Sequence, residues 1–231
     1  MRTILVVKHE KIEGAGTLEE HLIATGRPFR VVEPGETGKL PALDDCKAIV
    51  SLGGPMNVYE EERYPFLALE DEFLRGAIEH EIPTLGICLG AQLLVKCMGA
   101  KVLKADEIEI GWHPVRLAKE ADSDPFFSGL PHLVETFHWH EDMFDIPRNG
   151  TSLAYSEICP NQAARIGECA WAIQFHPEMT MRMIEEWCEA SPFKVDKNGF
   201  LERYRRIEKA YKKHAALLYG NFIRIADERG I

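Results

Sequence analysis

The sequence lacks the features that mark secreted and membrane-bound proteins. Its six cysteines stand at wide, irregular spacings with no Cys-x-x-Cys pair, so no disulfide framework is indicated. No apolar run approaches the roughly 20 residues needed to cross a bilayer, and the apolar stretch after Met1 is too short for a secretory signal. We therefore expect a reduced, soluble, cytoplasmic protein with no membrane association.

An excess of positive charge is also absent. Lysine and arginine total 27 against 37 aspartates and glutamates, which gives a formal net charge of −10. Such a chain repels the phosphate backbone, so we expect no nucleic-acid partner. Internal repeats and low-complexity tracts are missing too, and 45% hydrophobic residues suit a domain that builds its core without disulfides.

Short apolar runs alternate with amphipathic segments in the first part of the chain. Strands are expected at 4–7, 29–32, 48–52 and 84–87, and helices at 17–25, at 66–80 and directly after 88. This alternation predicts a parallel sheet covered on both faces. After Gly99 the pattern changes to shorter strands, which predict antiparallel members: 101–103, 108–112, 115–117, 134–137, 152–155, 162–166 and 170–174.

The last part of the chain is expected to be helical. A helix at 180–190 and a polar connection at 191–198 precede a segment, 200–229, whose apolar residues fall on one stripe. We expect this stripe to pack on its own domain, with a partner-binding helix as the alternative and Gly220 as a point where the helix could break. The predicted organisation is a catalytic domain over 1–190 and a helical extension over 191–231 packed on it.

The stretch Gly86-Ile87-Cys88-Leu89-Gly90 follows a buried strand and opens a helix. Gly-x-Cys-x-Gly in this context is the thiol form of a nucleophile elbow, and the helix N-terminus favours a thiolate. The alternative is a cysteine that serves as a small core residue. A nucleophile needs a base and a group that orients the base.

Phe175-His176-Pro177-Glu178 supplies candidates for both roles. His176 follows an apolar strand, and Glu178 can accept a hydrogen bond from one ring nitrogen and leave the other free to take a thiol proton. Gly53-Gly54-Pro55 ends another strand of the same sheet. Main-chain N–H groups there and at Leu89 would form an oxyanion hole above Cys88.

These three segments resemble, in order and spacing, the three motifs of the class I (triad) glutamine amidotransferases, over about residues 1–190. The similarity is greatest to stand-alone proteins that resemble the glutaminase domain of GMP synthase. The resemblance implies a flavodoxin-like, three-layer α/β sandwich with a central, mostly parallel mixed sheet. It also implies that a thioester on Cys88 forms from glutamine and yields glutamate and ammonia, with His176 as base, Glu178 as its orienter and no cofactor.

The resemblance further implies oxyanion donors at Gly54 and Leu89. It places substrate contacts at Gly53, Gln92 and the segment His138-Trp139-His140. Glu141 stands where the family commonly has a small residue, which makes γ-glutamyl peptides or amides alternative substrates. Nothing after residue 190 resembles a synthetase, so ammonia would go to a separate acceptor subunit, or the protein is a free-standing hydrolase.

Three other functions are weighed against this one. His138, His140 and Asp142 would face the same side of a strand and could bind zinc in a metallohydrolase, but Met143 stands where a further histidine is expected. A thiol α/β-hydrolase would place its acid before its histidine, unlike Glu178. The third alternative is a binding module that keeps the fold without catalysis.

Overall fold

A computed structural model describes residues 2–229, which form one sheet of nine strands flanked by helices. The strand order is β2-β1-β3-β4-β9-β8-β7-β5-β6. In chain order the strands are β1 (Thr3–Val7), β2 (Phe29–Val32), β3 (Cys46–Ser51), β4 (Thr84–Ile87), β5 (Val102–Leu117), β6 (Leu133–Phe144), β7 (Gly150–Tyr155), β8 (Ala163–Ile166) and β9 (Ala170–Ile173).

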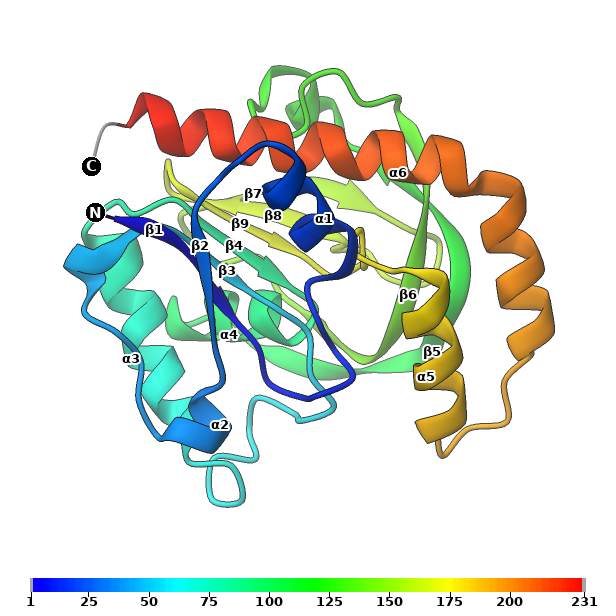
Figure 1. The fold of residues 1–231 in the computed structure, drawn as a ribbon, viewed down its shortest axis with the longest axis horizontal. Helices are drawn as coiled ribbons and strands as arrows, with labels where there is room; N and C mark the ends of the chain where they lie inside the picture. Colours follow the sequence, from blue (N-terminus) through cyan, green and yellow to red (C-terminus); the bar gives the residue numbers. More distant parts are fainter. Residues whose placement is uncertain (1, 230–231) are drawn as a thin grey trace.

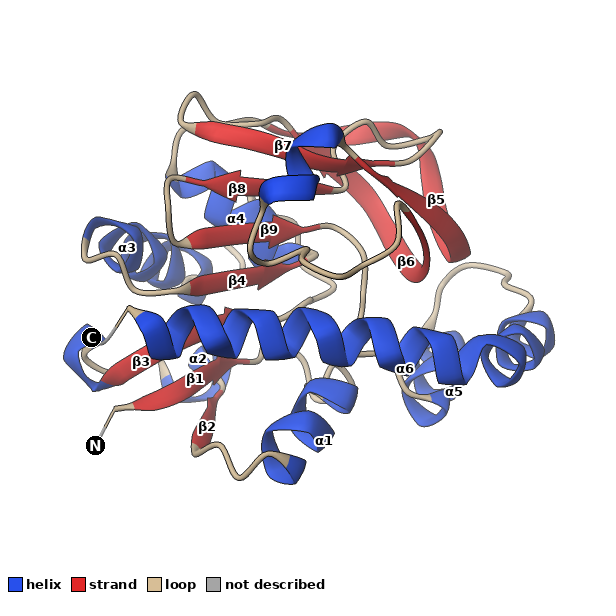
Figure 2. Ribbon diagram, turned by 90° about the horizontal axis from the view of Figure 1, so that it is seen from above, coloured by secondary structure: helices blue, strands red, loops and turns tan. Residues whose placement is uncertain are grey.

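The sheet has a parallel and an antiparallel part, which confirms the predicted mixed sheet. β2, β1, β3, β4 and β9 pair in parallel, and from β9 onward every neighbour is antiparallel. The carboxyl ends of the parallel strands therefore meet at one edge, where sites are built in open α/β sheets. The long β5–β6 hairpin curls away from the rest of the sheet beside this edge (Figure 2).

Helices cover both faces of the parallel part, so the predicted three-layer arrangement is also confirmed. α3 and α4 lie on one face, and α1 and α6 on the other (Figures 1 and 2). The helices are α1 (Gly16–Ala24), α2 (Pro34–Thr37), α3 (Phe66–Glu79), α4 (Leu89–Cys97), α5 (Met181–Ala190) and α6 (Lys197–Glu228), with short 3-10 turns at Leu43–Asp45 and Lys119–Ser123.

Strand β1 shows why the sheet needs both helical layers. Ile4 and Val6 pack into the core under α1 and α6, whereas Leu5 and Val7 pack into the core under α3 and α4. Side chains alternate along a strand, so an all-apolar strand must be covered on both faces. No helix of the described residues is both long and apolar enough to cross a membrane.

Two elements are longer than the sequence pattern indicates. The three short strands expected between 101 and 117 are one strand, β5, and β6 continues to Phe144, so its end carries His138 to Asp142. Pairing of the two strands along the hairpin supplies the continuity that local pattern does not show. Helix α6 runs through Gly220 without a break, because the apolar stripe on either side packs on the sheet.

Candidate active site

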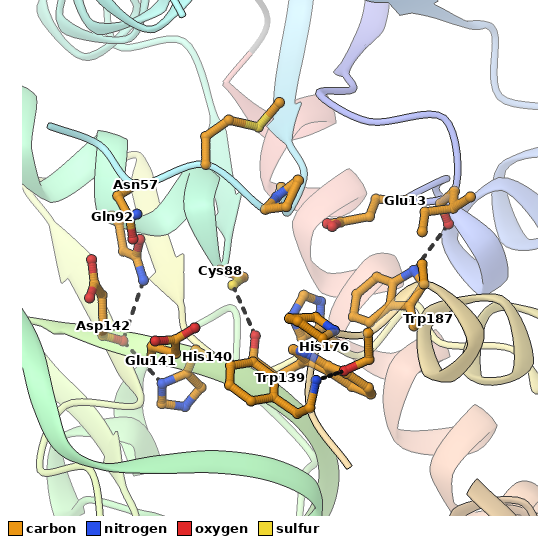
Figure 3. A pocket seen from close by; sticks show the side chains of 18 residues that line it. Glu13, Asn57, Cys88, Gln92, Trp139, His140, Glu141, Asp142, His176 and Trp187 are labelled. Atoms are coloured by element: carbon orange, nitrogen blue, oxygen red, sulfur yellow. Dashed lines mark hydrogen bonds between the residues drawn. The ribbon is translucent and has the colours of Figure 1, made fainter. Parts of the chain in front are cut away.

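Cys88 lies at the sharp turn between β4 and α4. Its backbone has φ 52° and ψ −108°, a conformation that is rare and strained for a residue with a side chain. The turn places the sulfur at the N-terminus of α4, in the wall of a cavity of about 240 Å³ (Figure 3). Strain at this position is characteristic of a nucleophile elbow.

The glycines on either side of Cys88 permit the close approach of strand and helix. A Cβ added to Gly86 would lie 2.5 Å from the carbonyl oxygen of Gly90, and one added to Gly90 would lie 2.2 Å from the carbonyl oxygen of Ser51. Both distances are too short for any side chain. The two glycines therefore allow α4 to begin directly over the ends of β3 and β4.

His176 and Glu178 form a buried pair beside Cys88. Nδ1 of His176 lies 2.6 Å from Oε1 of Glu178, and Nε2 makes no hydrogen bond among the described residues. Burial lowers the pKa of His176, but the Glu178 carboxylate and the Cys88 sulfur outweigh burial and raise this pKa well above its ordinary value. Because the His176 ring and the sulfur face the same cavity, the ring can exchange a proton there (Figure 3).

Helix α6 holds the backbone of this turn. The buried hydroxyl of Tyr211 donates to the carbonyl oxygen of His176 at 2.8 Å and accepts from the N–H of Met179 at 2.9 Å. On the other side, the N–H of His176 donates to the carbonyl oxygen of Phe137 on β6 at 2.8 Å. The segment beyond residue 190 is thus in direct contact with the turn that carries the candidate base.

Helix α1 holds the remaining carbonyl groups of the same turn. The hydroxyl of Thr17 donates to the carbonyl oxygen of Pro177 at 3.0 Å. The backbone N–H of Thr17 donates to the carbonyl oxygen of Glu178 at 2.9 Å. Tyr219 of α6 lies 3.1 Å from the Thr17 hydroxyl and can donate to it. With each of these groups paired, the turn has one well-defined conformation.

A second buried histidine anchors the Gly53-Gly54 turn. His9 follows β1. Its Nδ1 lies 2.9 Å from the carbonyl oxygen of Gly53, and its Nε2 lies 2.7 Å from Oε2 of Glu70. Ser51 donates to the other oxygen of Glu70 at 2.7 Å. Burial lowers the pKa of His9, but Glu70 outweighs burial and the pKa is raised.

This anchoring fixes the position of the predicted oxyanion donors. Gly54 contacts the Leu89 side chain and lines the cavity, and Leu89 is the first residue of α4, whose N–H has no partner within the helix. A Cβ added to Gly53 would lie 3.0 Å from Cε1 of His176 and 3.7 Å from Cβ of Cys88. The three motifs predicted from the sequence therefore meet in space.

The predicted substrate-binding residues separate into two groups. Gln92, Trp139 and His140 line the cavity, and the Gln92 amide is held by Oε1 of Gln174 at 3.2 Å. His138 is fully buried, and neither His138 nor Gly53 is among the residues that line the cavity. The predicted contacts of these two residues with substrate therefore have no support in the geometry.

His138 and His140 instead belong to a buried network around Glu109 of β5. His140 uses both ring nitrogens, with Nε2 at 2.9 Å from Glu109 and Nδ1 at 3.0 Å from the carbonyl oxygen of Asp142. Gln162 donates to the same Glu109 carboxylate at 2.6 Å. Burial lowers the pKa of His138 to about 4, so this ring is neutral near pH 7.

The zinc site proposed as an alternative from the sequence, with His138, His140 and Asp142 as ligands, has no support in the structure. The atoms close enough to hold one metal ion among the described residues belong to Glu109, His138 and His140, and Asp142 is not part of that group. A metal ion there would have to displace the hydrogen bond that joins Glu109 to His140. The Asp142 carboxylate faces the cavity instead, and neither of its oxygens has a hydrogen-bond partner among the described residues (Figure 3).

Comparison with known proteins agrees with this geometry. The family model for glutamine amidotransferase class-I matches residues 17–188. The chain belongs to this family. The resemblance inferred from the three motifs is thereby confirmed.

Relatives within the family include two polypeptides that this chain matches over most of their length. The glutamine amidotransferase-like protein YfeJ of Salmonella typhimurium is 32% identical over 192 residues, covering 80% of this chain and 79% of that protein. A subunit of the glutamine-hydrolyzing GMP synthase of Pyrococcus abyssi is 34% identical over 144 residues, covering 59% of this chain and 71% of that polypeptide. The chain spans only about a quarter of the longer GMP synthases that it also matches.

A crystal structure of a glutamine amidotransferase from Thermotoga maritima has the same fold. It superposes with a TM-score of 0.88 at 35% identity, covering 96% of this chain and 98% of that one. This overlap extends past the 17–188 match of the family model and includes α6. The relation to this glutamine amidotransferase thus covers the helix that holds the candidate base turn.

Two residues of the amidotransferase site were not found from the sequence. Gln174 donates through Nε2 to the Cys88 sulfur at 3.5 Å. The sequence feature that could have identified it is a polar side chain at the end of an apolar strand, directly before Phe175. Glu13 also lines the cavity, and burial raises its pKa to about 7, with the nearby charge of His176 opposing that rise. Glu13 lies in a loop without any pattern that singles it out.

Proposed function

We propose that the protein hydrolyses the side-chain amide of glutamine to glutamate and ammonia through a γ-glutamyl thioester on Cys88. One observation carries this proposal. Nε2 of His176 is free of hydrogen bonds among the described residues and shares a cavity with the strained Cys88, while Nδ1 is held by Glu178. A nucleophile, a base and an orienting carboxylate in this arrangement are suited to acyl transfer.

Acylation follows from the positions of these groups. His176 takes the thiol proton at Nε2, and the Cys88 sulfur then attacks the carboxamide carbon of the substrate. The N–H groups of Gly54 and Leu89 stabilise the oxyanion, each worth about 3 kcal/mol in comparable sites. When the C–N bond breaks, the imidazolium gives its proton to the leaving nitrogen, and ammonia departs.

Deacylation repeats the same steps with water. His176 removes a proton from the water molecule that attacks the thioester carbon, and the C–S bond breaks. The sulfur recovers its proton from the ring, so glutamate leaves and Cys88 returns to its starting state. Glu178 keeps the ring in one tautomer and stabilises its charged form through both halves of the reaction.

A specific observation favours γ-glutamyl amides as a second class of substrate. Three carboxylates line the cavity, those of Glu13, Glu141 and Asp142, and the described part of the lining contains no lysine or arginine. Such a cavity attracts amino groups and gives no cationic side chain to a carboxylate. Hydrolysis of γ-glutamyl amides whose leaving amine carries a second amino group, without an acceptor subunit, would fit this charge distribution.

A separate acceptor subunit remains part of the glutaminase proposal. The relative from Pyrococcus abyssi is named as one subunit of a glutamine-hydrolyzing GMP synthase. If this protein also supplies ammonia to a synthase partner, glutamine hydrolysis should rise when that partner is added. A free-standing hydrolase should reach its full rate alone.

The test is glutamate release by the purified protein from glutamine and from γ-glutamyl dipeptides, measured side by side. Cys88→Ala should abolish both reactions. Cys97→Ala is the matched control, since Cys97 lies in the same helix, is buried and donates to the carbonyl oxygen of Leu94 at 3.1 Å. Glutamate release that survives Cys88→Ala would refute the thioester mechanism.

A further inference from the structure

Beside His176 the cavity is lined by residues of α5 and of the segment that follows it. In the proposed reaction, on which this inference rests, the leaving nitrogen must lie next to Nε2 of His176, because that atom supplies its proton. Any group attached to this nitrogen would extend along the wall formed by Ile12, Trp187, Pro192 and Phe193. This wall is mostly apolar, so it suits a hydrocarbon chain.

One acidic side chain, Glu13, interrupts that apolar wall. Its carboxylate points toward the cavity centre from the His176 side (Figure 3), and among residues 2–229 it has no ion pair or hydrogen bond. Oε2 of Glu13 would lie 2.8 Å from a Cβ placed on Gly53, so the carboxylate is close to the reacting groups. A half-buried carboxylate without a partner is most readily stabilised by a cation.

The loop that carries Glu13 is fixed in place. The indole N–H of Trp187 donates to the carbonyl oxygen of Ile12 at 3.0 Å, and the N–H of Glu13 donates to the carbonyl oxygen of Glu10 at 3.1 Å. Trp187 also packs edge-on against the His176 ring, with centroids 5.0 Å apart. The backbone that carries Glu13 therefore has a set position relative to the ring that protonates the leaving group.

The opposite end of the cavity also has a buried acid. Asp142 is 3% exposed, faces the cavity near Gln92, and both of its carboxylate oxygens lack a hydrogen-bond partner among the described residues. Asp142 and Glu13 lie on opposite sides of Cys88 in Figure 3. A substrate that spans the cavity would meet a carboxylate at each end.

We propose that the protein acts on γ-glutamyl amides of α,ω-diamines, with the alkyl chain of the leaving amine along the Trp187 wall and its terminal ammonium on Glu13. The Cys88 sulfur bonds to the γ-carbonyl carbon, the C–N bond breaks, and the diamine leaves with the proton from His176. Water then releases glutamate. A leaving group that ends in a carboxylate, as in a γ-glutamyl peptide, is disfavoured by the charge of Glu13.

The test compares leaving groups of equal length. For the unmodified protein, kcat/KM for the γ-glutamyl amide of a diamine should exceed that for the amide of the corresponding n-alkylamine by about tenfold, a ratio typical of one partly buried ion pair. The γ-glutamyl amide of the ω-amino acid should be the poorest of the three. A series of diamines of increasing length should show a maximum where the ammonium reaches Glu13.

Two variants show whether Glu13 is responsible. Glu13→Gln should reduce the diamine-to-alkylamine ratio to about one, whereas Glu141→Gln, which removes a cavity carboxylate on the other side of Cys88, should leave the ratio as it is. An equal fall in both variants would mean that net cavity charge, not Glu13, selects the amine. Because the readout is a ratio, partial unfolding of a variant does not affect it.

The outcomes also separate this inference from the proposed function. If Cys88-dependent hydrolysis occurs and the unmodified protein shows a ratio near one, the diamine proposal is overturned and the thioester mechanism stands. If no γ-glutamyl compound is hydrolysed, or if hydrolysis survives Cys88→Ala, the proposed function itself fails.

Discussion

Two buried histidine–carboxylate pairs lie close to Gly53, and they differ in the use of the second ring nitrogen. His9 faces an acceptor with each nitrogen, the Gly53 carbonyl and the Glu70 carboxylate. His176 faces Glu178 with Nδ1 and has no hydrogen-bond partner for Nε2 among the described residues. A fully bonded ring holds structure in place, whereas a ring with one free nitrogen at a cavity can move a proton.

The antiparallel half of the sheet contains another histidine with both ring nitrogens hydrogen-bonded. His140 also uses both nitrogens, one of them on Glu109, and its ring forms part of the cavity wall. Burial and a nearby carboxylate are therefore shared by all three histidines. The free nitrogen distinguishes His176 from His9 and His140.

The largest expected effect comes from replacing each ring in turn. His176→Gln and His9→Gln both leave a buried carboxylate without its partner, so each should lower the free energy of unfolding by about 3 kcal/mol. Turnover by the folded protein should fall by at least about 10³-fold in His176→Gln, since the base is lost. It should fall by no more than about tenfold in His9→Gln, which alters only the support of the Gly53 turn.

Urea unfolding gives the free energy of unfolding, and glutamate release gives the turnover. The folded fraction taken from each unfolding curve scales the turnover of that variant, so loss of folded protein is not mistaken for loss of turnover. Equal losses of turnover in the two variants would remove the distinction between the two pairs.

Glu178 is the carboxylate that raises the pKa of His176. Glu178→Gln removes this charge and leaves burial, which lowers that pKa. Because the raised pKa keeps the imidazolium present at higher pH, its loss should move the alkaline limb of kcat/KM to lower pH. Activity near pH 7 should fall about 10²-fold.

The pH profile of the unmodified protein should also fall on the acid side, as the sulfur–imidazole pair becomes fully protonated. An unchanged rate down to about pH 4 would contradict the proposed pair. An alkaline limb that does not move in Glu178→Gln would show that Glu178 does not set the pKa of His176.

The site residues that could be predicted from the sequence lie close to one another in the chain. His176 and Glu178 are two residues apart, and Gly86 and Gly90 flank Cys88, so local pattern shows each motif. The supporting contacts join distant residues, such as His9 with Glu70, 61 positions apart, and have no local signal. The same reason explains why the parallel strands matched expectation, whereas β5 became visible as one strand only through its pairing with β6.

The smallest expected effect tests whether α6 contributes to the reaction as well as to the fold. Tyr211→Phe removes the hydroxyl that joins the His176 carbonyl and the Met179 N–H, leaving both buried groups without that partner. Unfolding should become easier by about 1–2 kcal/mol. We expect kcat to fall up to about tenfold with KM unchanged, because the ring of His176 is less well held.

Tyr204→Phe is the matched control for this change. Tyr204 is also buried in α6 and packs against Tyr211 with ring centroids 6.1 Å apart, but its hydroxyl makes no hydrogen bond to the base turn among the described residues. Its removal should leave kcat and the alkaline limb where they are. If Tyr211→Phe lowers stability but moves neither kcat nor the pH profile, α6 supports the fold alone, and the free nitrogen of His176 is positioned entirely by Glu178 and the elements before residue 190.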